Sequence, residues 1–188
     1  SKVDLYDDNF RANNILSNTE IKKKKYDFIV ISPGINILKC SLKNFLKKNK
    51  DKIITDLDIF YLEYSVRNII GITGTNGKST TSKLIYDILL KNKKDVRLVG
   101  NFGKPILDEK NIKKSTIFIV EVSSYQLDYS QFFKCNYSIL LNISPDHLER
   151  HKNLKKYINV KLKILKNQEN EGIGLIDNDN RIIKEVDR

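Results

Sequence analysis

A glycine-rich loop that ends in a lysine and two hydroxyl residues is the segment of this sequence best suited to chemistry. It reads Gly-Ile-Thr-Gly-Thr-Asn-Gly-Lys-Ser-Thr from Gly71 to Thr80, after an apolar run and before a helical pattern over residues 79–91. Glycines allow backbone N–H groups to turn toward phosphate oxygens, and the helix N-terminus adds a favourable dipole. The loop therefore predicts a nucleotide-phosphate site in which Lys78 neutralises the β- and γ-phosphates and Ser79 binds Mg²⁺.

The spacing of this loop differs from the strict phosphate-loop pattern, whose first glycine would fall at Ile72. A glycine turn that only caps a helix is the alternative, and Gly-Lys-Ser between a strand and a helix disfavours it. The predicted nucleotide-binding residues are Gly74, Thr75, Asn76, Gly77, Lys78, Ser79 and Thr80.

Short apolar runs alternate with helical patterns along the chain. Strands are predicted over residues 26–31, 52–55, 67–73, 96–99, 116–122, 137–143 and 172–176, and helices over residues 37–48, 57–64, 79–91 and 154–165. The strands are apolar throughout instead of alternating, which is typical of parallel strands covered on both faces. We therefore predict an α/β fold with a mostly parallel sheet, and we place a domain boundary near residues 65–67.

Polar residues gather just after the predicted strand ends, where open α/β sheets bind ligands. Glu121 ends a very apolar strand and needs a partner there, such as Mg²⁺ beside a phosphate. A helix cap or an ion pair is the alternative for this carboxylate. His147 follows the strand over residues 137–143 and would bind metal or phosphate, or serve only as a turn residue.

Three further polar residues are considered as site residues: two of them have both a functional and a structural interpretation, and the third has no predicted role. Asn101 lies in Gly-Asn-Phe-Gly and is either a turn former or an amide that binds a polar substrate. Lys161 falls on an amphipathic helix, where a surface lysine is the alternative to a functional one. His151 is interpreted as a solvated residue at a helix start, without a role.

The composition is that of an ordinary folded domain. The 188 residues suit one large or two small domains, and the formal net charge is +11. Lysine clusters are scattered without interleaved aromatic residues, so we interpret them as solvated faces and predict no nucleic-acid partner. A weaker interpretation of the positive charge is that it attracts anionic nucleotide substrates. No apolar run is long enough for a membrane span, so no membrane association is predicted. The isolated Cys40 and Cys135 fit a reducing, cytoplasmic compartment.

Several motifs together resemble the Mur ligase family, whose members build the peptide of bacterial peptidoglycan. Residues 74–80 are similar to the family's ATP loop, and Glu121-Val-Ser-Ser-Tyr-Gln-Leu is similar to its D-glutamate-adding branch. Four other segments match family motifs in the expected order: Ser32-Pro-Gly-Ile, Gly100-Asn-Phe-Gly, residues 141–151 and residues 157–161. The resemblance runs over about residues 26–177.

The resemblance implies an ATP-dependent amide ligase that adds D-glutamate to UDP-N-acetylmuramoyl-L-alanine. ATP would phosphorylate the alanyl carboxylate, and the amine of D-glutamate would then attack the acyl phosphate and release phosphate. Such phosphoryl transfer depends on positioning and charge neutralisation. The full-length enzyme is expected to be a cytoplasmic monomer that serves peptidoglycan synthesis, and hence cell shape and cell division.

Roles for individual residues also follow from the resemblance. Lys78, His147 and Lys161 would be catalytic. Ser79 and Glu121 would bind one Mg²⁺, and His147 with a carbamylated Lys161 would serve a second. Carbamylation would turn the lysine ammonium into an anionic oxygen ligand, which explains why a lysine would face a metal.

The resemblance finally implies substrate contacts and a division into domains. Asn101, His147 and Ser32 would hold the acceptor, with Ser32 on its UDP-sugar. Residues 1–65 would form a partial, Rossmann-like UDP-sugar-binding domain, and residues 66–188 a partial, P-loop-type central ATP-binding domain. The C-terminal D-glutamate-binding domain would be absent and both ends incomplete, so the chain alone is expected to be inactive.

Three alternatives remain open. Another Mur ligase is one, although the diamino-acid-adding enzyme typically has histidine after the two serines, where this chain has Tyr125. A folylpolyglutamate synthase-like ligase is the second, although its loop usually has glycine after the lysine, where this chain has Ser79. A non-catalytic nucleotide-binding fragment is the third, and it would bind Mg·ATP without any dependence on a UDP-sugar.

Overall fold

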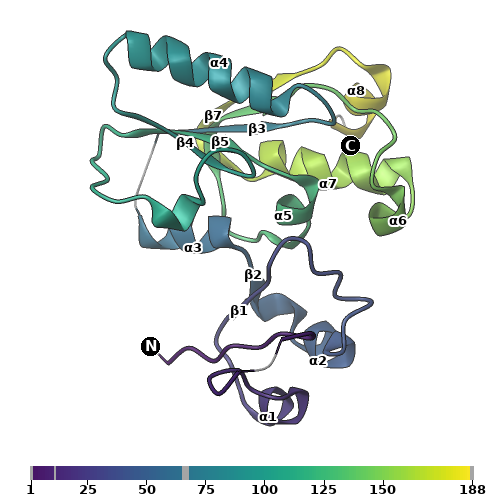
Figure 1. Ribbon diagram of the computed structural model, residues 1–188. Helices are drawn as coiled ribbons and strands as arrows, with labels where there is room; N and C mark the ends of the chain where they lie inside the picture. The colour runs from purple at the N-terminus through teal and green to yellow at the C-terminus, as the bar shows by residue number, and fades with distance from the viewer. Residues whose placement is uncertain (1, 11, 65–67, 187–188) are drawn as a thin grey trace.

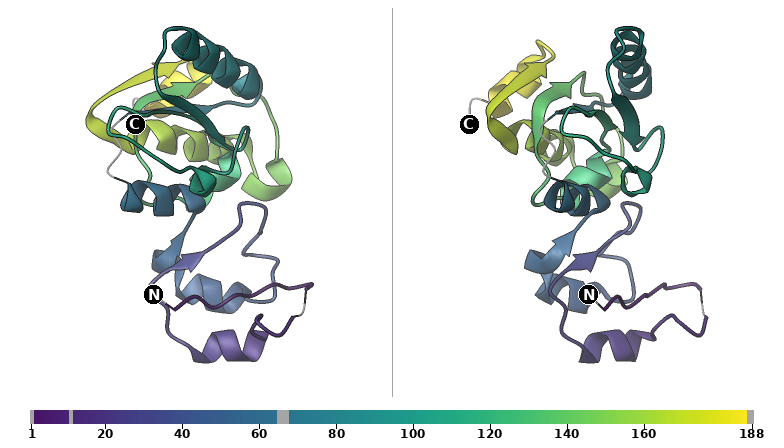
Figure 2. Two further views of the ribbon diagram at one scale, coloured as in Figure 1. Left: turned by 60° about the vertical axis from the view of Figure 1, so that its left-hand side comes forward. Right: turned by 90° about the vertical axis from the view of Figure 1, so that its left-hand side faces the viewer.

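The computed structural model describes residues 2–10, 12–64 and 68–186, and the predicted boundary at residues 65–67 lies outside them. Two parallel sheets organise the chain, a small one near the N-terminus and a larger one that follows (Figure 1). Figure 2 shows the N-terminal part on one side of the larger sheet, below its helices. No helix of the described residues is long and apolar enough to cross a membrane.

The N-terminal part contains two short parallel strands, β1 (Ile29–Val30) and β2 (Ile53–Ile54). The N-terminal part also contains helices α1 (Asn18–Lys23) and α2 (Lys43–Lys48) and the 3-10 turn η1 (Lys50–Lys52). Helix α3 (Asp56–Glu63) follows β2, and its buried Leu57 and Phe60 belong to the core of the larger sheet. The core of the N-terminal part is formed by the buried side chains of Ile21, Ile31, Leu42, Leu46 and Ile53.

The larger sheet has five strands in the order β4-β5-β3-β6-β7, and every neighbouring pair is parallel. The strands are β3 (Ile69–Thr73), β4 (Val96–Gly100), β5 (Ile117–Glu121), β6 (Cys135–Leu140) and β7 (Gln168–Ile176). Helix α4 (Lys78–Lys91) covers one face (Figure 1). Helices α5 (Ser124–Tyr129), α6 (Leu148–His151) and α7 (Leu154–Lys166) lie on the other side of the sheet. The predicted α/β fold with a parallel sheet is confirmed.

The remaining elements are the 3-10 turn η2 (Ile106–Asp108) and helix α8 (Asn180–Val186). Strands β3 and β5 are buried because α4 and α7 pack on opposite faces, which explains why their residues are apolar without alternation. Because these strands are parallel, the carboxyl ends of β3, β4, β5 and β6 meet at one end of the sheet, where the loop and the predicted site residues other than Ser32 lie.

Several predicted elements are shorter than expected. The strands predicted over residues 26–31 and 52–55 have only two residues each, Ile29–Val30 and Ile53–Ile54. The helix predicted over residues 37–48 begins only at Lys43, because the Asn36 side chain accepts the backbone N–H of Leu38 at 3.0 Å and holds a turn there. The strand predicted over residues 137–143 ends at Leu140, since Asn142 leaves the sheet and pairs with the backbone of Asn76. This early end puts Asn142 beside the phosphate loop.

A fully buried carboxylate joins α3 to the segment after α5. The Oδ1 atom of Asp58 accepts hydrogen bonds from Ser130 Oγ at 2.8 Å and from the backbone N–H groups of residues 131–133 at 2.7 to 3.0 Å. Its Oδ2 atom accepts from the backbone and hydroxyl of Thr55 at 2.8 and 3.0 Å. The buried carboxylate therefore accepts six hydrogen bonds, which satisfy its two oxygens without water.

Asp58→Ala is expected to lower the free energy of unfolding by about 4 kcal/mol, because several buried donors lose a charged acceptor at once. Urea unfolding followed by circular dichroism measures this change. The matched control is Asp51→Ala, an exposed aspartate, for which we expect a change below about 0.5 kcal/mol. Equal effects of the two substitutions would contradict the structural role of Asp58.

Candidate active site

The phosphate loop turns between the end of β3 and the first residue of α4. Gly77 is the residue before α4 and has a φ of 80°, a left-handed conformation that glycine adopts without strain. The N–H groups of the first helical turn thus open toward the loop, as expected for an anion site. The predicted strand–loop–helix arrangement is confirmed.

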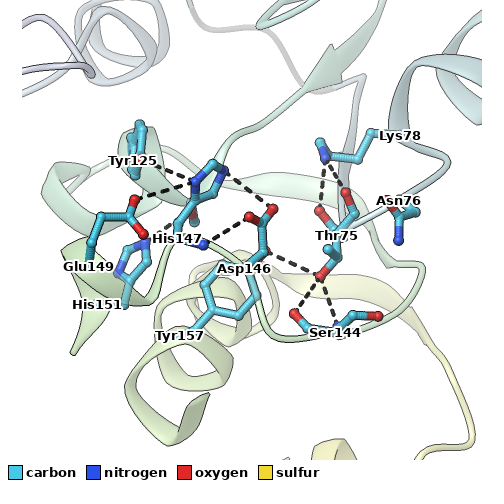
Figure 3. A network of polar contacts seen from close by, with 12 residues as sticks. Thr75, Asn76, Lys78, Tyr125, Ser144, Asp146, His147, Glu149, His151 and Tyr157 are labelled. Atoms are coloured by element: carbon cyan, nitrogen blue, oxygen red, sulfur yellow. Dashed lines mark hydrogen bonds and ion pairs between the residues drawn. The ribbon is translucent and has the colours of Figure 1, made fainter. Parts of the chain in front are cut away.

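Side chains from the β6 end fix the loop in this conformation. The amide of Asn142 accepts from the backbone of Asn76 at 2.9 Å and donates to its carbonyl at 3.0 Å. The hydroxyl of Thr75 accepts from the backbone N–H of Ser144 at 3.0 Å and lies 3.2 Å from the hydroxyl of Tyr157 (Figure 3). These contacts hold the loop in place without using the N–H groups of α4.

Lys78 lies over the loop that precedes it. Its Nζ atom donates to the carbonyl oxygens of Gly74 at 3.0 Å and Thr75 at 2.9 Å (Figure 3). The ammonium group also lines the adjacent cavity. A cation held in this way is positioned to neutralise an anion that enters the cavity.

Glu121 is 1% exposed and connects two other predicted site residues. Ser79 Oγ donates to one of its carboxylate oxygens at 2.7 Å, and Asn101 Nδ2 donates to the other at 2.7 Å. The backbone approaches closely here: Gly100 has a φ of 101°, and a Cβ at this position would lie 2.4 Å from the carbonyl oxygen of Glu121. Glu121 is therefore bound by neutral donors at a strand end, not by a helix cap.

This oxygen-rich group has the chemistry of a Mg²⁺ site. A buried carboxylate and a hydroxyl at a phosphate loop are hard oxygen ligands, which Mg²⁺ combines with phosphate oxygens and water. No group of three His, Cys, Asp or Glu side chains with metal-ligand geometry occurs among residues 2–10, 12–64 and 68–186. The residues that would hold Mg²⁺ here are Ser79 and Glu121.

Lys161 is a buried residue of α7, not a surface lysine. It is 2% exposed, and its Nζ atom donates to the carbonyl oxygen of Gly74 at 2.8 Å and to Thr73 Oγ1 at 3.3 Å. The ammonium also lies 4.8 Å from the ring centre of Tyr157, one helical turn earlier on the same face. Burial, reinforced by the charge of Lys78, lowers the pKa of Lys161 to about 7.

The titration of Lys161 links its burial to stability. Between pH 7 and pH 10.5 the unfolded chain holds a proton on Lys161 that the folded chain has lost, so this group makes stability rise with pH over that window. Lys161→Met removes the cost of a buried charge. The variant is therefore expected to be stabilised relative to the parent most strongly below pH 7, and this difference in the free energy of unfolding should decrease toward pH 10.5. Urea unfolding at both ends of the window measures this trend.

The matched control for this prediction is Lys156→Met, an exposed lysine on the same helix. Because Lys156 is exposed, its removal should change the free energy of unfolding by less than about 0.5 kcal/mol at either pH. A pH-independent difference between Lys161→Met and the parent would contradict the lowered pKa.

His147 follows β6 and lines the same cavity as Lys78. It has a φ of 50°, and its Nδ1 atom lies 3.2 Å from the hydroxyl of Tyr125 (Figure 3). Its Nε2 atom lies 3.4 Å from a carboxylate oxygen of Asp146, and Nδ1 lies 3.8 Å from one of Glu149. Two acidic groups and a phenol therefore orient an imidazole that is 44% exposed.

A cavity of about 140 Å³ brings these groups together. Four predicted site residues line it: Lys78, Asn101, His147 and Lys161. Five other lining residues had no predicted role: Ser123, Ser124, Tyr125, Asp146 and Tyr157. In the sequence, Asp146 adjoins His147, Tyr157 lies one helical turn before Lys161, and residues 123–125 belong to the Mur ligase-like segment that begins at Glu121.

Ser32 lies in an exposed turn after β1, in the N-terminal part, and does not line this cavity. The interpretation of His151 as solvated is wrong, because it ends α6 and is 4% exposed. Its Nε2 atom lies 3.1 Å from Ser124 Oγ, its ring packs near Tyr157, and burial lowers its pKa.

The sequence profile of the Mur ligase middle domain matches residues 72–188, more than half of the chain. The chain belongs to the Mur ligase family. The match covers α4 and every predicted site residue except Ser32. The predicted family and fold class of this Mur ligase chain are therefore confirmed, whereas the roles of single residues and the domain boundary stay predictions.

Named relatives cover almost all of this Mur ligase chain. The UDP-N-acetylmuramoylalanine–D-glutamate ligase of Rickettsia bellii is 38% identical over 181 residues, which are 96% of this chain and 40% of that relative. The chain thus spans about two fifths of the length of that curated relative.

Solved Mur ligases share the fold. UDP-N-acetylmuramate:L-alanyl-γ-D-glutamyl-meso-diaminopimelate ligase from Neisseria meningitides superposes with a TM-score of 0.58 at 15% identity, over 90% of this chain and 57% of that chain. MurF ligase from Thermotoga maritima, in complex with ADP, gives a TM-score of 0.54 at 18% identity, over 87% of this chain and 46% of that chain. At such identities the likeness shows the fold alone.

Proposed function

We propose that this chain supplies the nucleotide site and part of the acceptor site of an ATP-dependent ligase that joins D-glutamate to UDP-N-acetylmuramoyl-L-alanine. The observation that supports this most strongly is the 38% identity over 96% of the chain to a ligase of that name. The cavity lined by Lys78, Asn101, His147 and Lys161 supports it independently, because it joins a phosphate loop to groups that bind a polar acceptor. The reaction would serve peptidoglycan synthesis.

The proposed reaction has two steps. The alanyl carboxylate attacks the γ-phosphorus of ATP, the bond to the bridging oxygen breaks, and ADP leaves as an acyl phosphate forms. The amine of D-glutamate then attacks the acyl carbon, loses a proton and expels phosphate, so an amide remains. The protein mainly positions the reactants and neutralises charge in both steps.

The phosphate loop performs the first part of this work. The N–H groups of residues 74–80 and the dipole of α4 would hold the phosphates, and Lys78 would neutralise the γ-phosphoryl group as charge develops. ATP is supported by the fold shared with a Mur ligase crystallised with ADP. Mg²⁺ would be held by Ser79 and Glu121, where it supplies positive charge between ATP and the acceptor.

Lys161 and His147 would act on the acceptor side of the cavity. An amine whose pKa is about 7 is partly neutral at physiological pH, so Lys161 is able to react with CO₂ and become a carbamate. The two carbamate oxygens, which share one negative charge, would suit a second Mg²⁺ better than an ammonium does, with His147 beside it. Asn101, which donates to Glu121 and lines the same cavity, would bind the acceptor.

The domain organisation is part of this proposal. Residues 1–65 would contact the UDP-sugar through the turn at Ser32, and residues 66–188 would bind ATP. We assign none of residues 1–188 to D-glutamate, so we expect these residues by themselves to bind nucleotide without completing ligation. We place the complete enzyme in the cytoplasm as a monomer, which suits the free thiols of Cys40 and Cys135.

The test is phosphate release from ATP by a longer protein that carries this chain and an amino-acid-binding domain. Mg²⁺ and UDP-N-acetylmuramoyl-L-alanine are supplied, and D-glutamate is compared with L-lysine, meso-diaminopimelate and L-glutamate. We expect strict dependence on D-glutamate. Turnover with another amino acid would make the protein a different Mur ligase, and binding of Mg·ATP by this chain without acceptor-dependent release would leave a nucleotide-binding module.

A further inference from the structure

A buried arginine lies between the N-terminal part and the candidate active site. The side chain of Arg150, in α6, is 6% exposed. Its guanidinium carbon lies 4.7 Å from the ring centre of Tyr125 and 4.8 Å from that of Tyr129. A planar cation beside two aromatic rings gains cation–π attraction from each and keeps its N–H donors directed along its own plane.

The donors of this cluster converge on one backbone carbonyl of the N-terminal part. Arg150 Nη1 donates to the carbonyl oxygen of Ile35 at 2.9 Å, and the hydroxyl of Tyr129 donates to the same oxygen at 3.2 Å. The backbone N–H of Ile37 donates back to that hydroxyl at 3.3 Å. Ile35 N–H also closes the turn at Ser32, at 3.0 Å, so the cluster fixes the turn proposed to contact the acceptor.

The guanidinium also contacts a residue that lines the cavity, Tyr125. Tyr125 packs against the ring of His147, with centroids 4.9 Å apart, and their polar atoms are 3.2 Å apart. Arg150 Nη2 is buried and makes no hydrogen bond with the described residues, but it lies 3.7 Å from the carboxylate of Asp128. A buried cation is thereby held by one ion pair, one carbonyl and two rings, which fixes its position.

We propose that Arg150 is a positioning residue. It keeps the turn over residues 32–35 at a fixed position relative to the Tyr125–His147 pair, and so aligns the acceptor with the cavity. This inference rests on the proposed function. The side-chain contacts given above do not reach the loop over residues 74–80. Loss of Arg150 should therefore weaken the use of the acceptor and leave nucleotide binding unchanged.

The test compares Arg150→Met, Arg150→Lys and the parent in the longer ligase. Arg150→Met keeps the length of the side chain but loses charge and donors, and we expect KM for the UDP-sugar acceptor to rise about tenfold or more while the Kd of Mg·ATP stays within about twofold. Arg150→Lys keeps the charge but not the planar fork, so it should recover only part of the loss. Lys152→Met, an exposed lysine two residues later, is the control and should change neither constant.

A second measurement uses this chain alone and does not depend on the reaction. Amide hydrogen exchange in Arg150→Met is expected to be about tenfold faster at Ile35 and Ile37, with unchanged exchange in α4. If Arg150→Met does not fold, Tyr129→Phe removes only the hydroxyl that holds Ile35 and Ile37, and the same two amides should exchange faster.

The outcomes separate this inference from the proposed function. A parent that shows no acceptor-dependent release overturns the proposed function and the role of Arg150 in it. A parent that turns over normally, with variants that change acceptor and nucleotide constants equally or not at all, overturns the inference alone. Unchanged exchange at Ile35 and Ile37 in both variants would also overturn it.

Discussion

Lys78→Ala is expected to reduce phosphoryl transfer from ATP by about 10²–10³-fold in the complete ligase, because it removes one preorganised charge from the γ-phosphoryl group. The fold should be retained, since the carbonyl of Gly74 still accepts a hydrogen bond from Lys161. Calorimetric titration of this chain with Mg·ATP should show weaker binding, and steady-state phosphate release should show the loss of kcat.

The matched control is Lys83→Ala, which removes the same charge from the exposed face of α4, where Lys83 pairs with Asp87. Turnover of this control should equal that of the parent. A second consequence distinguishes a local electrostatic effect from unfolding: because the charge of Lys78 helps to lower the pKa of Lys161, that pKa should rise in Lys78→Ala. Normal turnover in Lys78→Ala would remove the proposed role.

Glu121→Gln is expected to reduce Mg²⁺-dependent turnover by about 10³-fold, because a neutral amide is a poor ligand for a hard cation and charge stabilisation of several kcal/mol is lost. The substitution changes charge with almost no change in shape. Its oxygen still accepts from Asn101, and its NH₂ group is able to donate to the Ser79 hydroxyl, which rotates to accept. Both buried hydrogen bonds are therefore kept.

Two readouts separate metal binding from folding in this variant. The free energy of unfolding should stay within about 1 kcal/mol of the parent value, because no buried group loses its partner. The Mg²⁺ concentration for half-maximal activity should rise. Glu63→Gln, an exposed carboxylate at the end of α3, serves as control and should leave the Mg²⁺ dependence unchanged. An unchanged Mg²⁺ dependence in Glu121→Gln would exclude Glu121 as a ligand.

Local signals in the sequence were sufficient for the main elements of the sheet. Continuous apolar runs gave β3 and β5 within one or two residues, and the helical spacing after Gly77 gave α4. Short helices were missed because their patterns are too brief for periodicity. Helix α5 had a usable signal, since Ser123 and Gln126 form a reciprocal capping box at its start.

The sequence by itself determined the phosphate loop, the parallel sheet and the likeness to Mur ligases, because these depend on motifs and apolar runs that are continuous in the chain. Only the tertiary structure decided that Lys161 is buried against Gly74, that Asn101 and Ser79 share the carboxylate of Glu121, and that Arg150 reaches Ile35. These contacts join residues 20 to 115 positions apart. Their geometry follows from the parallel order of β4, β5 and β3 and from the packing of α6 and α7, which no local pattern specifies.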